Sequence, residues 1–282
     1  MKNMKKFASL GLSLVMMLSL AACGGSKTPA ASGSAAPAGS ADGSAAAAES
    51  DLEYVKGKGK LVVGITDFAP MDYKDKDGKW IGFDADNATA FAKSLGVDVE
   101  FIEVDWDNKI MELESKSIDC VWNGMTLTDE IQSNAACTKA YAKNAQVVVM
   151  KSDADYSSTA DLVGKTVVAE AGSAGESAIQ DDESLSQADY VSKSVQTDCL
   201  MEVAAGTADA AVLDLTLATA MIGEGTDYAN LAIKDELNAE EYGVAFRKGS
   251  DVAEAVNAAF DELKADGTMQ KLADKYSLTL AE

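Results

Sequence analysis

The chain has 282 residues, with 46 Asp and Glu against 24 Lys and Arg, and its formal net charge is −22. Such a surface repels nucleic-acid phosphates, so we expect no nucleic-acid partner. The sequence contains no histidine, which excludes Ser-His-Asp hydrolases and histidine-based metal sites, and we expect neither a metal nor a cofactor.

The first segment, residues 1–22, has the order of parts of a bacterial secretion signal. Three lysines precede an apolar run over residues 7–20 that is too short to span a bilayer stably. The motif Leu20-Ala21-Ala22-Cys23 resembles the lipobox of bacterial lipoproteins, in which the cysteine is acylated after cleavage. The resemblance implies a palmitate-bearing lipid anchor at Cys23 on the extracytoplasmic face of the cell membrane. An ordinary signal peptide with Cys23 as a chance residue is the alternative.

A low-complexity segment follows, and with Cys23 it forms a predicted linker over residues 23–50. Residues 24–50 contain no aromatic residue and no Val, Ile, Leu or Met. Because such a segment buries too little apolar surface to offset its ordering entropy, we expect it to be disordered. Roughly 230 residues remain, enough for two lobes.

Three cysteines remain once Cys23 is assigned to lipid, namely Cys120, Cys137 and Cys199. An odd number cannot form a complete disulfide framework, and no C-x-x-C spacing is present. We expect them to act as small buried hydrophobic residues, although one pair could oxidise.

Residues 58–282 alternate between short β-branched runs and longer amphipathic stretches. The runs predict strands over residues 61–65, 97–104, 118–122, 145–150, 166–169, 210–213 and 242–246. The stretches predict helices over residues 85–95, 106–113, 174–180, 197–205, 215–222, 252–265 and 269–276. This alternation predicts an α/β fold with mainly parallel sheets flanked by helices. Ligands bind such sheets at the carboxyl ends of the strands.

Residues 172–175 offer a weak motif at one of these ends. Gly172-Ser173-Ala174-Gly175 follows a predicted strand and opens a predicted helix, where free backbone N–H groups could hold a carboxylate or other anion. A plain strand-to-helix turn is the alternative. The chain has no G-x-G-x-x-G after its first strand and no P-loop lysine, so no nucleotide site is indicated.

An ordered series of motifs covers the whole of residues 51–282. The motifs are DGKWIGFD at 77–84, VDW at 104–106, SID at 117–119, GMTLT at 124–128, AGS at 171–173, YGVAFRKG at 242–249 and LKADGT at 263–268. In this order and spacing they resemble the family 3 extracellular solute-binding proteins, which serve polar amino acid ABC importers.

The resemblance implies a two-lobe, type II periplasmic-binding-protein fold. Lobe 1 would be residues 51–144 plus 245–282, and lobe 2 residues 145–244, joined by two hinge strands. A monomer of this kind captures an amino acid or related amino-bearing solute between its lobes and, once closed, is recognised by the permease of an ABC importer.

The resemblance also assigns roles to individual residues. Asp214 stands where the family has the aspartate that pairs with the ligand's ammonium group, although it also begins a helical pattern and is a candidate N-cap. Gly124 and Thr126 match positions that hold the ligand's carboxylate and amine, and Thr128 begins the helix beside them. A plain turn is the alternative for these three.

Two departures weaken the capture of a carboxylate. After Thr128 the family pattern runs Pro-Glu-Arg, whereas this chain has Asp129-Glu130-Ile131, and an apolar side chain cannot replace the bidentate guanidinium. Arg247, the only arginine of the chain, stands where the family has a basic surface residue. Ala174, next to Ser173, replaces a ligand-binding threonine and leaves only backbone N–H groups on that side.

The expected aromatic wall is also altered. Phe68-Ala69-Pro70-Met71 replaces the family's Tyr-x-Pro-Phe, and Phe68 keeps a stacking surface. Trp122 and Asn123 directly precede Gly124 at a strand end, so Trp122 could stack on the ligand and Asn123 could form a hydrogen bond with it. Core packing is the alternative for Trp122.

We expect no catalysis, because acid–base chemistry here would rely on carboxylates, lysines, tyrosines and cysteines alone. Two alternatives remain: a dehydratase of the same fold that acts on cyclohexadienyl acids, and a ligand-binding sensor domain. The missing arginine argues against the dehydratase.

Overall fold

The computed structural model describes residues 50–282. The predicted signal, Cys23 and residues 24–49 of the predicted linker lie outside the described residues. Within residues 50–282, no helix is both long and apolar enough to cross a bilayer.

The described chain is built on a nine-stranded sheet in the order β4-β1-β5-β11-β7-β10-β8-β9, with β6 paired to β11. The strands are β1 (Lys60–Ile65), β4 (Asp98–Glu103), β5 (Cys120–Thr126), β6 (Ala136–Cys137), β7 (Ala142–Lys151), β8 (Thr166–Glu170), β9 (Asp189–Lys193), β10 (Ala210–Asp214) and β11 (Leu231–Phe246). A separate pair contains β2 (Tyr73–Lys74) and β3 (Trp80–Ile81).

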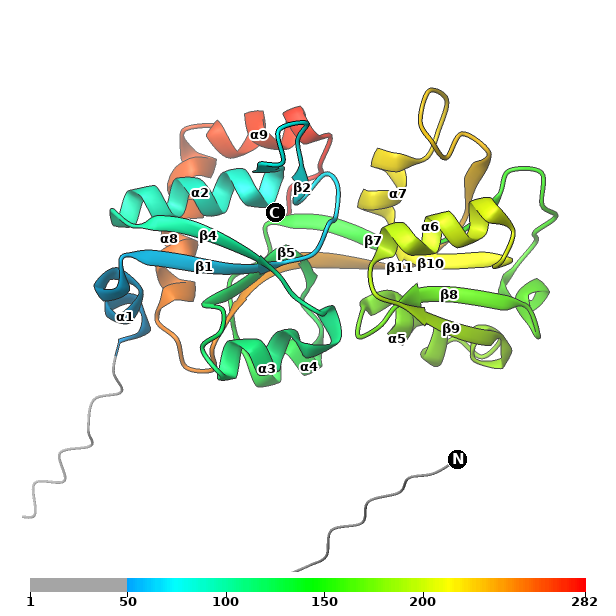
Figure 1. Cartoon of the computed structure of the whole chain (residues 1–282), viewed down its shortest axis with the longest axis horizontal. Coiled ribbons are helices and arrows are strands. Elements are labelled where there is room, and N and C mark those ends of the chain that lie inside the picture. The colour runs from blue at the N-terminus through cyan, green and yellow to red at the C-terminus, as the bar shows by residue number, and fades with distance from the viewer. Residues whose placement is uncertain (1–49) are drawn as a thin grey trace, which may run out of the picture. The chain divides into compact units, whose positions relative to one another are not determined.

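The sheet is parallel at its two ends and antiparallel in the middle. Strand β1 pairs in parallel with β4 and β5, and β8 pairs in parallel with β9 and β10. The long strands β7 and β11 run antiparallel to each other, β11 pairs with β5, and β7 pairs with β10. We call the part around β4, β1 and β5 the first half and the part around β10, β8 and β9 the second half. Figure 1 shows the two halves side by side, with β7 and β11 running between them.

Helices cover both faces of the sheet (Figure 1). They are α1 (Asp51–Lys58), α2 (Phe83–Leu95), α3 (Lys109–Glu114), α4 (Asp129–Asn134), α5 (Ala174–Asp181), α6 (Gln196–Ala205), α7 (Leu215–Met221), α8 (Val252–Ala265) and α9 (Thr268–Tyr276). Three 3-10 helices are η1 (Trp106–Asn108), η2 (Thr159–Leu162) and η3 (Leu185–Gln187). The fold is thus the predicted α/β arrangement, with a parallel part in each half and one continuous mixed sheet that joins them.

The strands separate apolar layers because successive side chains point to opposite faces of a sheet. Val63 lies in the core cluster that contains residues of α2, α6, α7, α8 and α9, whereas Val62 lies in a cluster with Leu113 of α3. Likewise Val168 faces the first cluster, and Val167 faces one that includes α5. Each half therefore has an apolar core on both faces of its strands.

The three cysteines of the described chain are free thiols. Cys120 and Cys199 are buried, and Cys137 is half-buried. Their environment is that of small core residues rather than of a disulfide framework.

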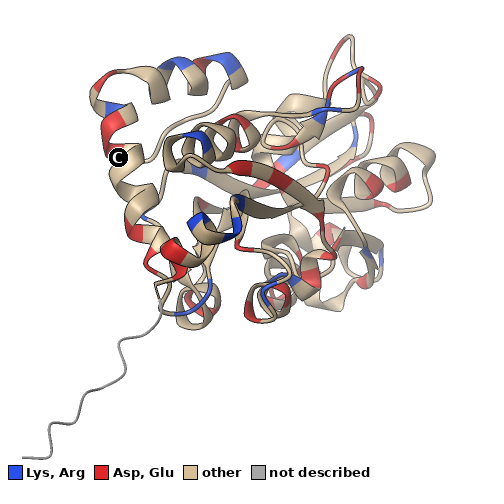
Figure 2. Cartoon of the chain, turned by 60° about the vertical axis from the view of Figure 1, so that its left-hand side comes forward, with Lys and Arg blue, Asp and Glu red and all other residues tan. Residues whose placement is uncertain are grey.

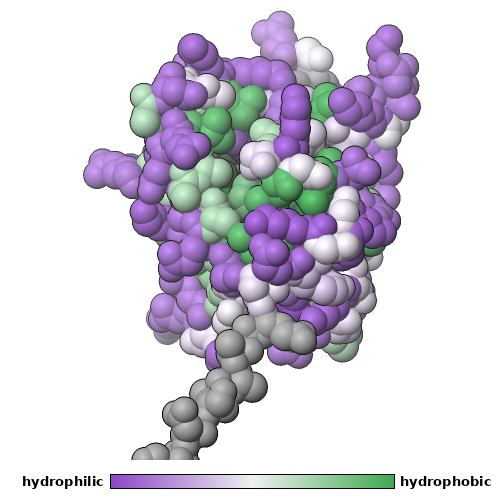
Figure 3. All heavy atoms as spheres, turned by 90° about the vertical axis from the view of Figure 1, so that its left-hand side faces the viewer, coloured by the Kyte–Doolittle hydropathy of each residue, from purple (hydrophilic) through white to green (hydrophobic). Residues whose placement is uncertain are grey.

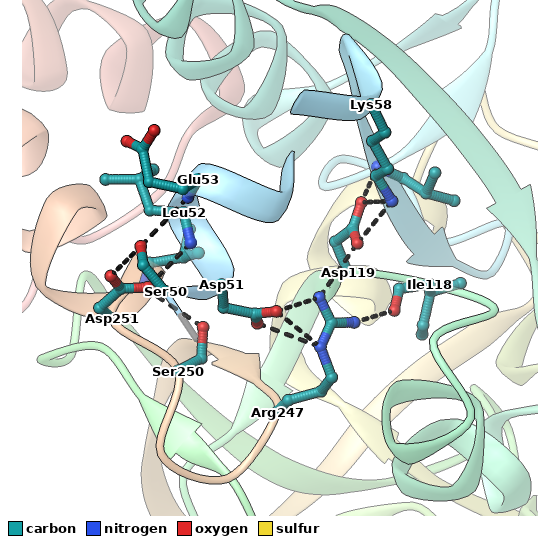
Figure 4. Close-up of polar contacts among 12 residues, drawn as sticks. Ser50, Asp51, Leu52, Glu53, Lys58, Ile118, Asp119, Arg247, Ser250 and Asp251 are labelled. Carbon is teal, nitrogen blue, oxygen red and sulfur yellow. Dashed lines mark hydrogen bonds and ion pairs between the residues drawn. The ribbon is translucent and has the colours of Figure 1, made fainter. Parts of the chain in front are cut away.

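Helix α1 was not predicted from sequence, and it is held by polar contacts (Figure 4). Ser50, the last residue of the predicted linker, is its N-cap and accepts a hydrogen bond from the Glu53 N–H at 3.1 Å. The Ser50 hydroxyl also donates to Asp251 at 2.6 Å. Ser50 is therefore part of the folded chain.

Arg247 is a buried cross-link and not the basic surface residue that the resemblance implied. Its guanidinium donates to Asp51 of α1 at 2.9 Å, to Asp119 at 3.1 Å and to the carbonyl oxygen of Ile118 at 2.7 Å (Figure 4). It joins α1 to the residues that precede β5.

Acidic residues are spread over the ribbon of the described chain and interspersed with basic ones (Figure 2). At the end of the molecule where the described chain begins, polar residues cover most of the surface, and apolar residues gather in the centre of that face (Figure 3). A surface of this composition suits a protein that works in water.

Candidate ligand-binding cavity

A cavity of about 370 Å³ lies where the two halves meet, at the carboxyl ends of strands from both. The first half contributes the residues after β1 and at the end of β5, together with η1, α3 and α4. The second half contributes the ends of β8 and β10 and the start of α5. The predicted site residues that line the cavity are Phe68, Asn123, Gly124, Thr126, Thr128, Ser173, Ala174 and Asp214.

Trp122 corrects the predicted aromatic wall. Its side chain is fully buried in the core and packs against Phe91 and Phe260, with ring centroids at 6.2 Å and 5.6 Å. It does not line the cavity among the described residues. The alternation of a strand turns its side chain into the core above the sheet, so core packing is the correct interpretation.

Phe68 and Gly124 form one wall together. Gly124 has a left-handed φ of 54°, and a Cβ atom there would lie 2.4 Å from the Phe68 ring. Only glycine combines this backbone conformation with so close an approach. The Gly124 N–H donates to Asp84 at 2.7 Å, so this donor is used within the protein.

Asn123 is occupied by the protein itself. Its carbonyl oxygen accepts hydrogen bonds from the N–H and hydroxyl of Thr66, at 3.0 Å and 2.9 Å. Its amide donates to Asp72 at 2.7 Å. Asn123 therefore fixes the chain after β1 with the polar groups of its side chain.

The start of α4 shows the effect of the missing arginine. Thr128 caps the helix by accepting a hydrogen bond from the Ile131 N–H at 3.2 Å. The Ile131 side chain lines the cavity and packs in the apolar cluster that contains Trp106. Thr126, just before, donates its hydroxyl hydrogen to Glu240 at 2.8 Å.

The start of α5 already holds a carboxylate of the chain. Ser173 caps α5 by accepting from the Glu176 N–H at 3.1 Å, and Ala174 is the first residue of the helix. The Glu176 carboxylate in turn accepts from the Gly172 N–H at 2.7 Å. The strand-to-helix turn thus has one of its N–H donors occupied by a protein side chain.

Asp214 is buried and surrounded by donors. Its carboxylate accepts hydrogen bonds from Tyr242 at 2.7 Å, from Gln146 at 3.1 Å, and from Asn144 and Gln196. Burial raises the pKa of Asp214 to about 8, and the nearby Glu240 carboxylate adds to this rise.

Asp214 precedes α7 without capping it through its side chain. Asn144 caps the start of α7 instead, because its side-chain carbonyl oxygen accepts a hydrogen bond from the Thr216 N–H at 3.0 Å. The alternative role of Asp214 as a side-chain N-cap is therefore not the one in the structure.

Glu170 was not predicted from sequence. It ends β8, its residue is only 3% exposed, and it lines the cavity. Within residues 50–282 its Oε1 atom has no hydrogen-bond partner. Burial raises the pKa of Glu170 to about 8, and the Asp214 carboxylate contributes to the rise. Its place at a strand end, directly before the Ala171-Gly172-Ser173 motif, was the available signal.

Lys109 connects the halves across the cavity. The buried Nζ atom donates to the carbonyl oxygen of Gly172 in the second half at 2.8 Å and to that of Trp106 at 3.1 Å. Burial lowers the pKa of Lys109, against the opposing effect of Glu170.

The charged side chains that line the cavity are predominantly acidic. In the described chain they are one ammonium group, that of Lys109, and five carboxylates, those of Asp107, Glu130, Glu170, Glu176 and Asp214. Walls of one sign focus the field on a cleft and raise the local concentration of the opposite charge.

Residues 61–279 match the family model of the bacterial extracellular solute-binding proteins, family 3. The arginine-binding extracellular protein ArtP of Bacillus subtilis is 33% identical over 227 residues, which cover 78% of this chain and 87% of ArtP.

Solved structures give the same result. A P235GK mutant of ArgBP from T. maritima is 33% identical, with a TM-score of 0.74 over 80% of this chain and 98% of that one. An ancestral amino acid-binding protein, AncCDT-1, described as a precursor of cyclohexadienyl dehydratase, is also 33% identical, with a TM-score of 0.73 over 80% and 99%. The chain therefore belongs to the bacterial extracellular solute-binding proteins of family 3 and has their type II periplasmic-binding-protein fold.

Proposed function

We propose that this protein is the extracytoplasmic substrate-binding subunit of an ABC importer and that it captures an amino acid or related amino-bearing solute for delivery to the permease. The observation that carries the proposal is the buried Asp214 carboxylate, oriented by four side chains in a cavity that both halves line. A desolvated carboxylate pairs strongly with an ammonium group.

The position of the cavity supports a mechanism of closure. Ligand contacts on both halves stabilise the closed arrangement, and the equilibrium between open and closed forms shifts by the difference in their affinities. The Lys109 contact with Gly172 adds a protein contact across the same gap. A permease that recognises the closed form would then receive the loaded protein.

The anchor belongs to the same proposal. Cleavage before Cys23 and acylation of its sulfur would hold the protein on the outer face of the cell membrane, with residues 24–49 as a tether. We expect Cys23→Ser to release the protein from the membrane fraction and to abolish labelling by palmitate. Membrane retention of this variant without lipid would contradict the anchor.

We propose binding without turnover. A dehydratase is the second candidate, because AncCDT-1, itself an amino acid-binding protein, is described as a precursor of cyclohexadienyl dehydratase. Cyclohexadienyl acids are anions, however, and the cavity presents five carboxylates to them. Conversion of prephenate or arogenate by the purified protein would establish the enzyme instead.

Binding is tested by a thermal-shift screen of amino acids and amines, with hits measured by calorimetry. A ligand at a hundredfold excess over its Kd stabilises the folded state by about 2.7 kcal/mol. We expect Asp214→Asn to lower the affinity for a hit by about 10- to 100-fold, because a charged hydrogen bond is lost. Glu262→Gln, on the exposed face of α8, removes an equal charge and is the control. Equal affinity in Asp214→Asn would remove the role assigned to Asp214.

A further inference from the structure

The cavity contains a buried carboxylate, Glu170, that has an oxygen without a hydrogen-bond partner in the described chain. What this implies about the ligand of the cavity rests on the proposed function. Glu170 Oε1 has no hydrogen-bond partner within the described chain, although the residue is 97% shielded from solvent at the edge of the cavity. A buried polar atom that lacks a partner is costly. A donor from a ligand would remove that cost.

The carboxylates of Glu170 and Asp214 differ in the hydrogen bonds that they receive from the protein. Asp214 receives four side-chain hydrogen bonds from the protein. Lys109 lowers the pKa of Glu170 and so favours its ionised form, but it gives its own hydrogen bonds to two backbone carbonyl groups. Of these two buried carboxylates, Glu170 is thus the one that remains open to a cation.

The cavity provides little that would hold an anion. Ile131 occupies the position of the carboxylate-binding arginine and packs in an apolar cluster. Arg247 is bound to Asp51 and Asp119, outside the cavity lining. At the start of α5, the Glu176 carboxylate already accepts the Gly172 N–H.

We propose that the cavity selects a small organic cation, an amine or a guanidine, whose charged group binds Glu170 beside Asp214, and that it does not require a ligand carboxylate. The ligand donates N–H groups to the open Glu170 oxygen and compensates the excess of acidic groups. Phe68 offers an apolar surface to the uncharged part of such a ligand.

Matched pairs of compounds test this directly. The purified protein is titrated by calorimetry with arginine and agmatine and with lysine and cadaverine, which differ by the carboxylate alone, and with glutamine and glutamate. We expect agmatine or cadaverine to bind within about tenfold of its amino acid or more tightly, and glutamine and glutamate to bind at least about 100-fold more weakly.

The outcomes separate this inference from the proposed function. If removing the carboxylate abolishes binding, or if glutamine binds as tightly as the cations, the inference is wrong while the protein remains an amino acid-binding protein. If no amino acid or amine binds, both are wrong.

A variant locates the effect at Glu170. Glu170→Gln keeps the shape of the side chain, and we expect it to lower the affinity for the tightest cation by about 10- to 100-fold. Glu262→Gln is the control for loss of one acidic charge, and circular dichroism verifies that each variant is folded. An unchanged Kd in folded Glu170→Gln would show that Glu170 does not bind the cation.

Discussion

Two groups of buried carboxylates in this molecule differ in their partners. Asp119, which precedes β5, is paired with Arg247 and Lys58 and also accepts the Val62 N–H at 2.7 Å. Glu170 and Asp214, at the cavity, receive no ion pair from the described chain within 4.0 Å. Both groups lie at ends of strands and are nearly inaccessible to solvent.

The difference separates structural from ligand-directed charge. The ions around Asp119 satisfy one another, so their role is to hold α1 and the neighbouring strands together. Asp214 is held in place by neutral donors, whereas one Glu170 oxygen has no donor among the described residues. An uncompensated buried charge stays costly until a partner of opposite charge arrives.

Removing an ion-pair partner of Asp119 should lower the stability of the protein without changing its affinity for a ligand. Arg247→Met leaves Asp51 without its guanidinium partner and weakens the compensation of Asp119, so we expect the free energy of unfolding to fall by about 2 to 3 kcal/mol. Denaturant titration measures this change. Lys60→Met removes an exposed ion pair with Glu100 and should leave the midpoint nearly unchanged. A loss of ligand affinity in Arg247→Met with no loss of stability would contradict the distinction.

The cavity carboxylates should make cation binding depend on pH. Burial raises the pKa values of Glu170 and Asp214 to about 8, so below pH 8 a proton must leave before a cation can pair with either group. We expect affinity to fall by about tenfold per pH unit for each proton released as the pH drops from 8 to 6. Calorimetry in buffers of different ionisation enthalpy counts those protons. In Glu170→Gln the affinity for the cation should depend less on pH. An affinity that does not change with pH in the unaltered protein would contradict the mechanism.

Burial determines the direction of this dependence, and the neighbours of Glu170 modify its size. Asp214 and Asp105 raise the pKa of Glu170, whereas Lys109 and the neighbouring Gln196 amide lower it. Because burial outweighs these opposing effects, the folded state without ligand binds more protons than the unfolded state between about pH 5 and 8. Its stability should therefore decrease as the pH rises through that range, and less so in Glu170→Gln.

The smallest expected effect comes from returning an arginine to the cavity. Ile131→Arg places a guanidinium among the five carboxylates. We expect it to lower the affinity for agmatine by about tenfold and to increase the preference for arginine over agmatine, because a cation is repelled and a carboxylate gains a partner. Competition calorimetry with the two compounds measures the ratio. An unaltered ratio would show that position 131 does not face the ligand's carboxylate end.

Local sequence patterns are informative for the buried parts of strands and less so for exposed elements. The alternating apolar runs predicted the buried parts of β7 and β11, but the structure extends β11 back to Leu231 through exposed and half-buried residues. The missed helix α1 is short and largely exposed, and it buries Val55 alone within the described chain. Such elements carry little apolar periodicity, so contacts with the rest of the folded chain determine whether they form.

The order of the motifs by itself determined the family, the two-part α/β fold and the position of Asp214, since the spacing of strand ends along the chain sets which residues reach the same edge of a sheet. The tertiary structure decided the rest. Trp122 lies in the core and Asn123 is occupied by Thr66 and Asp72 because helices α2 and α8 and the chain after β1 supply their partners. Glu170 remains open for the converse reason: whether a buried side chain is satisfied depends on groups distant in sequence, and these come together only when the chain folds.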